Sequence, residues 1–254
     1  INQGFNSVSI GNQAGEFYQG SGSIAIGYQA GQYTQSINTI AIGNFAGNDP
    51  QGTNAIAIGN FAGQINQAIN TVAVGHLSGV YTQGMDCVAI GAYSGQTLQG
   101  RGAIAIGAYS GSLTQSSYGI AIGHQAGSGF ANTQALPGIP VDNPQYQNAI
   151  AMGTAAGYAG QGTNSLALGN FSGFAFQGPN SIALGNFAGG GLYETEYLLP
   201  AYGSGQQSGS IAIGFYAGQS AQGTNAISIG NYAGLSLQNS GGISIGYQAG
   251  TNQQ

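Results

Sequence analysis

The sequence predicts an all-β protein, a parallel β-solenoid (β-roll) with one coil per 16 residues and about 14 coils. Three observations predict it. A phrase such as NAIAIGNFAG at 54–63 recurs at a fixed step, short apolar stretches alternate with small residues, and glycines punctuate every copy. A fixed short period is typical of solenoids, in which each repeat stacks only on its neighbours.

Fourteen units can be aligned, and their first residues are Asn6, Gly22, Asn38, Asn54, Asn70, Asp86, Gly102, Tyr118, Asn148, Asn164, Asn180, Gly209, Asn225 and Gly241. The step is 16 residues, except for 30 after the eighth unit and 29 after the eleventh. We number the positions of a unit 1 to 16, so that Asn54 stands at position 1. The whole chain, 1–254, is expected to be a single solenoid domain with insertions at 128–144 and 190–205.

Positions 2 to 5 of each unit read as a short strand. Position 3 is always Val, Ile or Leu, position 5 is Ile, Val, Leu or Met, and position 4 is always Ala or Ser. Such alternation indicates a strand, whereas the glycines at positions 6 and 10 disfavour a helix and suit corners with positive φ. Strands of successive coils should therefore pair in parallel, about 4.7–4.9 Å apart.

Side chains alternate across a strand, so we expect Ile56 and Ile58 to fill the coil and Ala57 to face outward. An outward position that never exceeds Ser in size suggests close packing against another copy of the chain. The expected self-association face comprises Ala25, Ala41, Ala57, Ala73, Ala89, Ala105 and Ala121. Alternatively, small residues merely relieve crowding in a narrow coil. If the facing is reversed, the strand still remains apolar on both sides.

Position 14 is Gln throughout, and the expected Gln ladder comprises Gln19, Gln35, Gln51, Gln67, Gln83, Gln99, Gln115, Gln145, Gln161, Gln177, Gln206, Gln222 and Gln238. Each stacked amide can donate to one neighbour and accept from the other, which fixes the register of the coils. A sugar-binding or ice-binding role for this column is less favoured, because a ladder consumes the donors that a ligand would need.

Position 8 is mostly aromatic or Gln, as in Phe45, Phe61 and Gln29. Rings of neighbouring coils should stack there. Core or interface packing is the default interpretation, and a ligand-stacking platform is the alternative.

The two insertions should leave the solenoid at one edge, between positions 10 and 14. Because loops on a rigid scaffold commonly carry recognition, they are expected to form one patch against a neighbouring subunit or a receptor. Its residues are Pro137, Asp142, Tyr193, Glu194, Glu196 and Tyr197. The alternative is a pair of surface loops without a role.

Composition excludes several classes of function. The chain has one Arg, no Lys and six acidic residues, so nucleic-acid binding is not expected. No apolar run reaches the roughly 18 residues of a membrane span, so membrane insertion is not expected either. His76 and His124 stand three coils apart, too far to share a metal. Ser residues lack His and Asp companions, so no catalytic site, metal or cofactor is expected and the protein is not expected to be an enzyme.

Two isolated residues or motifs have simple interpretations. Cys87 occupies a position that is filled elsewhere by Ser, Ala, Thr or Gly, so it is expected to be a small space-filling residue. Asn170-Phe171-Ser172 matches a glycosylation sequon, which here reflects the Asn preference at position 7.

The phrases NSVSIG (Asn6–Gly11), NSLALG (Asn164–Gly169) and NSIALG (Asn180–Gly185) resemble the head repeats of YadA-like trimeric autotransporter adhesins, the haemagglutinin-type repeat. The phrase AIAIGNFAG followed by a Gln is also similar to repeat proteins of giant viruses. The resemblance to the adhesins implies a left-handed parallel β-roll, three chains side by side and a surface that binds host matrix. The repeat here is a little longer than the adhesin repeat, and no neck, stalk or anchor motif is seen.

We therefore expect a structural, fibre-forming β-solenoid at a cell surface, a virion surface or otherwise outside the cell. It would self-associate laterally and, because no capping repeats are seen, end to end, as a homo-oligomer such as a trimer or a helical filament. The first alternative is an adhesin or viral receptor-binding fibre whose loops contact a host receptor or glycan. A minor alternative is an ice-binding solenoid, although no Thr column is present.

Overall fold

The computed structural model describes residues 2–129, 145–191, 193–194, 199–200 and 205–252. It is a parallel β-solenoid of about 16 residues per turn, and the described residues contain no helix. The chain divides into two compact units, 1–118 and 119–254. The predicted fold class is confirmed for both units, while the single domain over 1–254 stays a prediction.

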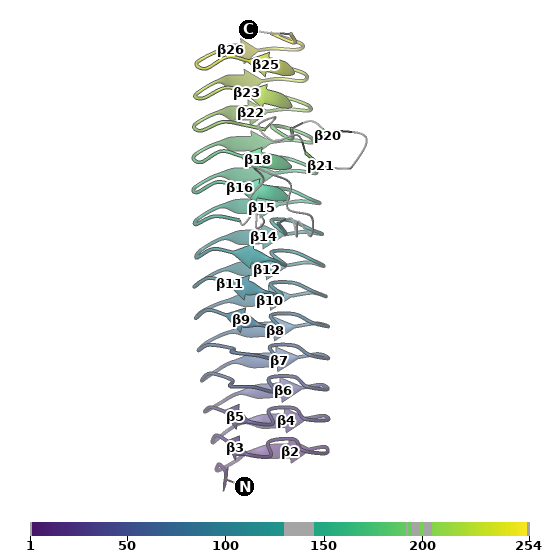
Figure 1. Ribbon diagram of the computed structural model, residues 1–254, viewed down its shortest axis with the longest axis vertical. Helices are drawn as coiled ribbons and strands as arrows, with labels where there is room; N and C mark the ends of the chain where they lie inside the picture. The colour runs from purple at the N-terminus through teal and green to yellow at the C-terminus, as the bar shows by residue number, and fades with distance from the viewer. Residues whose placement is uncertain (1, 130–144, 192, 195–198, 201–204, 253–254) are drawn as a thin grey trace. The chain divides into compact units, whose positions relative to one another are not determined.

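The first unit stacks short strands in direct register (Figure 1). Its main sheet contains β2 (Val8–Ile10), β4 (Ile24–Ile26), β6 (Ile40–Ile42), β7 (Ile56–Ile58), β8 (Val72–Val74), β10 (Val88–Ile90) and β12 (Ile104–Ile106). Shorter strands follow at positions 13 and 14 of the units, namely β1 (Asn2–Gln3), β3 (Tyr18–Gln19), β5 (Thr34–Gln35), β9 (Thr82–Gln83), β11 (Leu98–Gln99) and β13 (Thr114–Gln115). Ile56 pairs in parallel with Val72, its counterpart in the next repeat, so each repeat is one coil.

The second unit repeats this arrangement. Its main strands are β14 (Ile120–Ile122), β15 (Ile150–Met152), β17 (Leu166–Leu168), β19 (Ile182–Leu184), β22 (Ile211–Ile213), β24 (Ile227–Ile229) and β26 (Ile243–Ile245). The strands that end at position 14 are β16 (Ala159–Gln161), β18 (Ala175–Gln177), β23 (Ser220–Gln222) and β25 (Ser236–Gln238). Ile120 pairs with Ile150 and Ile182 with Ile211, so the stacking register passes over both insertions. Within the second insertion, β20 (Tyr193–Glu194) pairs antiparallel with β21 (Leu199–Pro200).

The corners of each coil depend on backbone conformations with positive φ. Gly59 has φ 131°, and a Cβ at this residue would lie 2.5 Å from the carbonyl oxygen of Gly75 in the next coil. Glycine is therefore required at position 6 for two reasons, its φ and the close approach of two backbones. At position 8 the left-handed conformation is adopted by non-glycine residues, as at Phe61 with φ 57°. Asn54, with φ 58°, shows why position 1 favours Asn and Gly.

The core is built from the smallest side chains, which corrects the expected facing of the strands. Ala57 is fully buried, while its neighbours Ile56 and Ile58 point outward and Ile58 is 37% exposed. Opposite Ala57, the next wall of the coil presents another buried Ala at position 9, Ala62. The coil is too thin to hold an Ile between these walls, so the alternative of crowding in a narrow coil is the correct one.

The prediction of an outward self-association face of alanines is therefore wrong. The residues predicted for that face, Ala25, Ala41, Ala57, Ala73, Ala89, Ala105 and Ala121, are all 0% exposed. They line the interior and are inaccessible to another chain.

Candidate functional site

The Gln column is a continuous polar part of the interior, and the predicted ladder is confirmed within both units. All of the predicted Gln residues are buried. Gln51 donates from Nε2 to Gln67 Oε1 at 3.1 Å, and Gln67 donates in turn to Gln83 Oε1 at 3.1 Å. In the second unit Gln206 donates to Gln222 Oε1 at 3.0 Å. Because these amides satisfy one another, the column stabilises the stack and is closed to a ligand.

The same amides also bond to the strand wall of the coil. Gln67 Nε2 donates to the carbonyl oxygen of Ile56 at 2.8 Å, and Gln51 Nε2 does the same to Ile40 at 2.9 Å. The ladder is incomplete at two points, since the buried Oε1 atoms of Gln35 and Gln177 accept no hydrogen bond from the described residues. Each Gln therefore links neighbouring coils and both walls of its own coil.

The outward side chains at positions 3 and 5 of every coil form an apolar surface that we call the isoleucine face. Ile40, Ile56 and Val72 stand in register on adjacent strands, so they shield one another and are each half-buried. Position 5 is more open, and Ile90 and Leu168 are 39% and 38% exposed. Within each unit the face covers seven strands, a run of about 28 Å.

The aromatic residues at position 8 stack along each unit as predicted. The rings of Phe45 and Phe61 lie 4.9 Å apart with an interplanar angle of 3°, and those of Tyr93 and Tyr109 lie 4.8 Å apart at 2°. Ring faces inside a stack contact each other, so a ligand would meet ring edges. This geometry favours packing over a ligand-stacking platform.

Charge contributes little to any site among the described residues. The Arg101 Nε and Asp86 Oδ2 atoms lie 3.6 Å apart on the surface, where ion pairs stabilise weakly. Cys87 is buried and donates to the carbonyl oxygen of Gly100 at 2.9 Å, which confirms its space-filling role. Burial raises the pKa of the Cys87 thiol above its usual range, and burial likewise raises the pKa of Tyr158.

Over the part of the chain that the structure describes, no cluster of three or more His, Cys, Asp or Glu side chains is placed to hold a metal ion. His76 instead packs edge-on against Tyr93, with ring centroids 5.4 Å apart. Among the described residues, no helix has the length and the apolar composition that crossing a membrane requires.

The predicted loop patch lies almost wholly outside the described residues. Pro137, Asp142, Glu196 and Tyr197 are not described, and Tyr193 and Glu194 are placed only as the backbone of β20. The adjoining coils show where the loops leave, since Gly129 donates to the carbonyl oxygen of Tyr158 and Gly190 accepts from the amide of Ala175. The hydrogen bonds between coils thus continue to position 12 in the first case and at least to position 11 in the second, and both insertions were expected to depart between positions 10 and 14.

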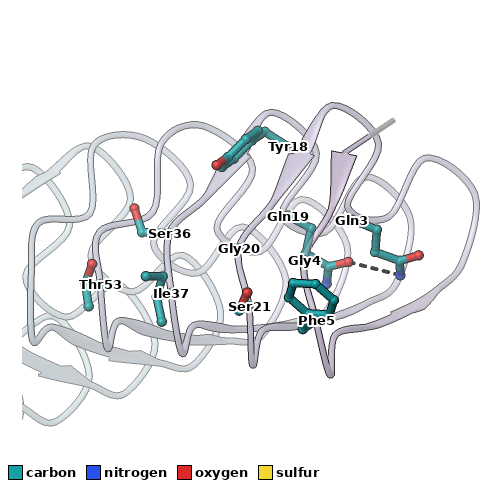
Figure 2. Close-up of a pocket in the computed structure, with 10 residues that line it drawn as sticks. All are labelled: Gln3, Gly4, Phe5, Tyr18, Gln19, Gly20, Ser21, Ser36, Ile37 and Thr53. Atoms are coloured by element: carbon teal, nitrogen blue, oxygen red, sulfur yellow. Dashed lines mark hydrogen bonds between the residues drawn. The ribbon is translucent and has the colours of Figure 1, made fainter.

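A groove along the first unit is a feature that sequence reasoning missed, and we call it the axial groove. Two hollows of about 660 and 460 Å³ meet at Ser36. The floor is formed at position 15 of successive coils by Gly4, Gly20, Ser36, Gly52, Ala68 and Gly84. Figure 2 shows Tyr18 on one side of the first hollow and Phe5 on the other. The signal in the sequence is the small residue at position 15 between larger residues at positions 13 and 16.

The fold and these surfaces define a β-solenoid repeat protein with a sealed polar ladder inside and apolar surfaces outside. No protein-family model, curated protein or solved structure matches this chain.

Proposed function

We propose that this protein is a structural, fibre-forming β-solenoid whose copies pack side by side through the isoleucine face. The observation that carries the proposal is the unbroken column of outward Ile, Val, Leu and Met side chains at positions 3 and 5 of successive coils, which are half-buried or exposed. A contiguous apolar patch of this kind is typical of an interface. Lateral packing is thus assigned to the outward side chains of the strands, in place of the buried alanines between them.

Further features support a role as a building element. The described interior is filled by buried Ala, Ser and Gln side chains, and the low charge leaves little repulsion between copies. The single Arg and the absence of Lys would limit cleavage by trypsin, which suits an exposed fibre outside a cell or on a virion. End-to-end stacking, a trimeric or filamentous arrangement and this location are parts of the same proposal.

Charge placed on the isoleucine face tests the proposal. Ile58→Asp with Ile90→Asp adds two carboxylates to the face, at side chains that are 37% and 39% exposed. The control, Asn44→Asp with Asn60→Asp, adds the same charge at position 7, outside the face. Sedimentation velocity and electron microscopy should show side-by-side assemblies for the wild type and the control, but none for the face variant, each with an unchanged far-UV circular dichroism spectrum. A wild type that stays monomeric when concentrated, or a face variant that assembles normally, contradicts the proposal.

A second candidate is an adhesin or viral receptor-binding fibre, supported by the two insertions that depart from one edge of the second unit. Deletion of both insertions should then abolish binding to a host receptor or glycan while assembly persists. If the deletion changes neither assembly nor binding, the receptor-binding function is contradicted and the purely structural function is retained.

A further inference from the structure

Over the first five coils, the position 16 side of the axial groove repeats every second coil. On the position 16 wall, large apolar side chains alternate with hydroxyls at Phe5, Ser21, Ile37 and Thr53. Ile69 continues the alternation in the next coil, and Met85 ends it. Phe5 and Ile37 are exposed, at 86% and 53%. On the opposite wall, Tyr18 and Pro50 stand two coils apart, and the polar residues Asn66 and Thr82 follow in the next two coils. At about 4.7–4.9 Å per coil, equivalent apolar side chains recur about every 9.4–9.8 Å.

This spacing matches one backbone conformation of an extended peptide. A polyproline II segment has three residues per turn and rises about 3.1 Å per residue, so one of its faces recurs about every 9.3 Å. A β-strand presents the same face about every 6.6 Å and falls out of step with the walls. The apolar side chains of the position 16 wall therefore recur at nearly the same distance as one face of a polyproline II ligand.

The chemistry of the groove also fits such a ligand. None of the residues that line the two hollows is charged. The hydroxyls of Tyr18, Ser21, Ser36 and Thr53 donate no hydrogen bond to any residue that the structure describes. A polyproline II backbone has no internal hydrogen bonds, so its carbonyls need donors, and aromatic-lined grooves commonly bind it.

The packing of the coils explains the floor of the groove but not its walls. A Cβ at Gly20 would lie 2.3 Å from the carbonyl oxygen of Ser36, so position 15 must be small where coils approach this closely. No such contact requires Tyr18, Ile37 or Pro50 to stand exposed on either side. In the second unit the same position carries Tyr146, Gln207 and Asn239, so an uninterrupted small-residue floor is a property of the first unit.

A segment of this chain has the required sequence. Residues 134–141, QALPGIPV, lie in the first insertion, outside the described residues, and are uncharged. Pro137 and Pro140 are three residues apart, the spacing at which polyproline II places both rings on one face. We propose that residues 134–141 of one copy bind in the axial groove of a neighbouring copy, with these two prolines against apolar side chains two coils apart. This inference rests on the proposed self-association and adds a second contact to it.

A binding experiment tests the groove with the full-length protein. A fluorescein-labelled peptide of residues 132–143 is titrated with the protein and followed by fluorescence anisotropy. We expect saturable binding. The affinity for the peptide should fall at least roughly tenfold for Ile37→Asn and for Tyr18→Ser, because each substitution removes about half of an apolar side chain that the bound peptide would bury. Tyr33→Ser is the matched control, since Tyr33 is 47% exposed and stands outside the two hollows. It should bind the peptide like the wild type.

Two further peptides test whether residues 134–141 are the segment that binds in the groove. A peptide with both prolines replaced by Ala should bind at least roughly tenfold more weakly, because the polyproline II conformation is no longer favoured. An unrelated proline-rich peptide should also bind more weakly. Absence of binding, equal binding of the Ala peptide or of the unrelated peptide, or insensitivity to Ile37→Asn and Tyr18→Ser would overturn the proposal.

Mixing two variants tests whether the contact joins two copies. A chain with the groove substitutions Tyr18→Ser and Ile37→Asn is mixed with a chain in which Pro137 and Pro140 are replaced by Ala. Both chains also carry Ile58→Asp and Ile90→Asp, so that lateral packing through the isoleucine face does not contribute to the signal. Each variant alone lacks the groove contact, but the mixture restores it in one direction, so labelled chains should show energy transfer only when mixed. Energy transfer that is no higher in the mixture than in either variant alone would overturn docking between copies. The Ile58→Asp and Ile90→Asp variant keeps its groove, so loss of lateral packing and loss of peptide binding are measured separately.

Discussion

The substitution Gln67→Leu tests whether the interior ladder stabilises the stack. Gln67 is 2% exposed and takes part in three hydrogen bonds: it accepts from Gln51, and it donates to Gln83 and to the carbonyl of Ile56. Leucine has a similar volume but makes none of them. Buried hydrogen bonds contribute about 0.5–1.5 kcal/mol each.

The loss is unevenly distributed over the three partners. The amide of Gln51 keeps the carbonyl oxygens of Ile40 and Ala55 as acceptors, at 2.9 and 3.2 Å. The Oε1 atom of Gln83 loses the Gln67 amide as its donor and stays buried. We therefore expect a loss of about 2–4 kcal/mol in the local free energy of unfolding.

Because coils of a solenoid interact only with their neighbours, the assay must resolve local opening. Amide hydrogen exchange read by mass spectrometry over peptides within residues 40–90 should show opening about 30- to 1,000-fold more often. Gln29→Leu is the matched control: Gln29 donates to Gln13 on the surface, and Leu77 already occupies the same position with the same φ of 53°. The control should change stability by less than about 0.5 kcal/mol. Equal effects of the two substitutions would refute a stabilising role for the buried ladder.

Three further predictions concern the walls of the coil. Ala57→Leu should destabilise the fold by about 1–3 kcal/mol or more in urea unfolding, because the narrow interior cannot accept the larger side chain, whereas Ile58→Leu should be nearly neutral. Gly59→Ala should cost about 3 kcal/mol or more, because it combines an unfavourable φ with a contact of 2.5 Å to the Gly75 carbonyl, and thermal unfolding would report it. Burial raises the pKa of Cys87, so the folded state keeps the thiol proton to higher pH than the unfolded chain, and stability should fall as pH rises through the ordinary pKa of a thiol. Cys87→Ser should remove that part of the pH dependence, and an unchanged slope would contradict the assignment.

Much of the architecture could be predicted from particular positions. Gly59 and Gly63 predicted corners, and their φ values of 131° and 51° confirm them. The Gln at position 14 of every repeat predicted a ladder, because amides that are stacked in register can each donate to one neighbour and accept from the other. The isoleucine face was missed because Ile-Ala-Ile is apolar on both sides of a strand, and alternation alone gives no direction. The axial groove was missed because its walls come from residues of different coils, far apart in the chain.

The period, the parallel stacking and the polar ladder follow from the sequence alone, because a side chain that recurs in every repeat stands above itself once per coil. Which side of the strand faces inward was decided only by the tertiary structure. The two walls of a coil lie so close together that Ala opposes Ala, and the larger Ile side chains are left outside. The surface available to another copy is consequently the one that the sequence had suggested for the core.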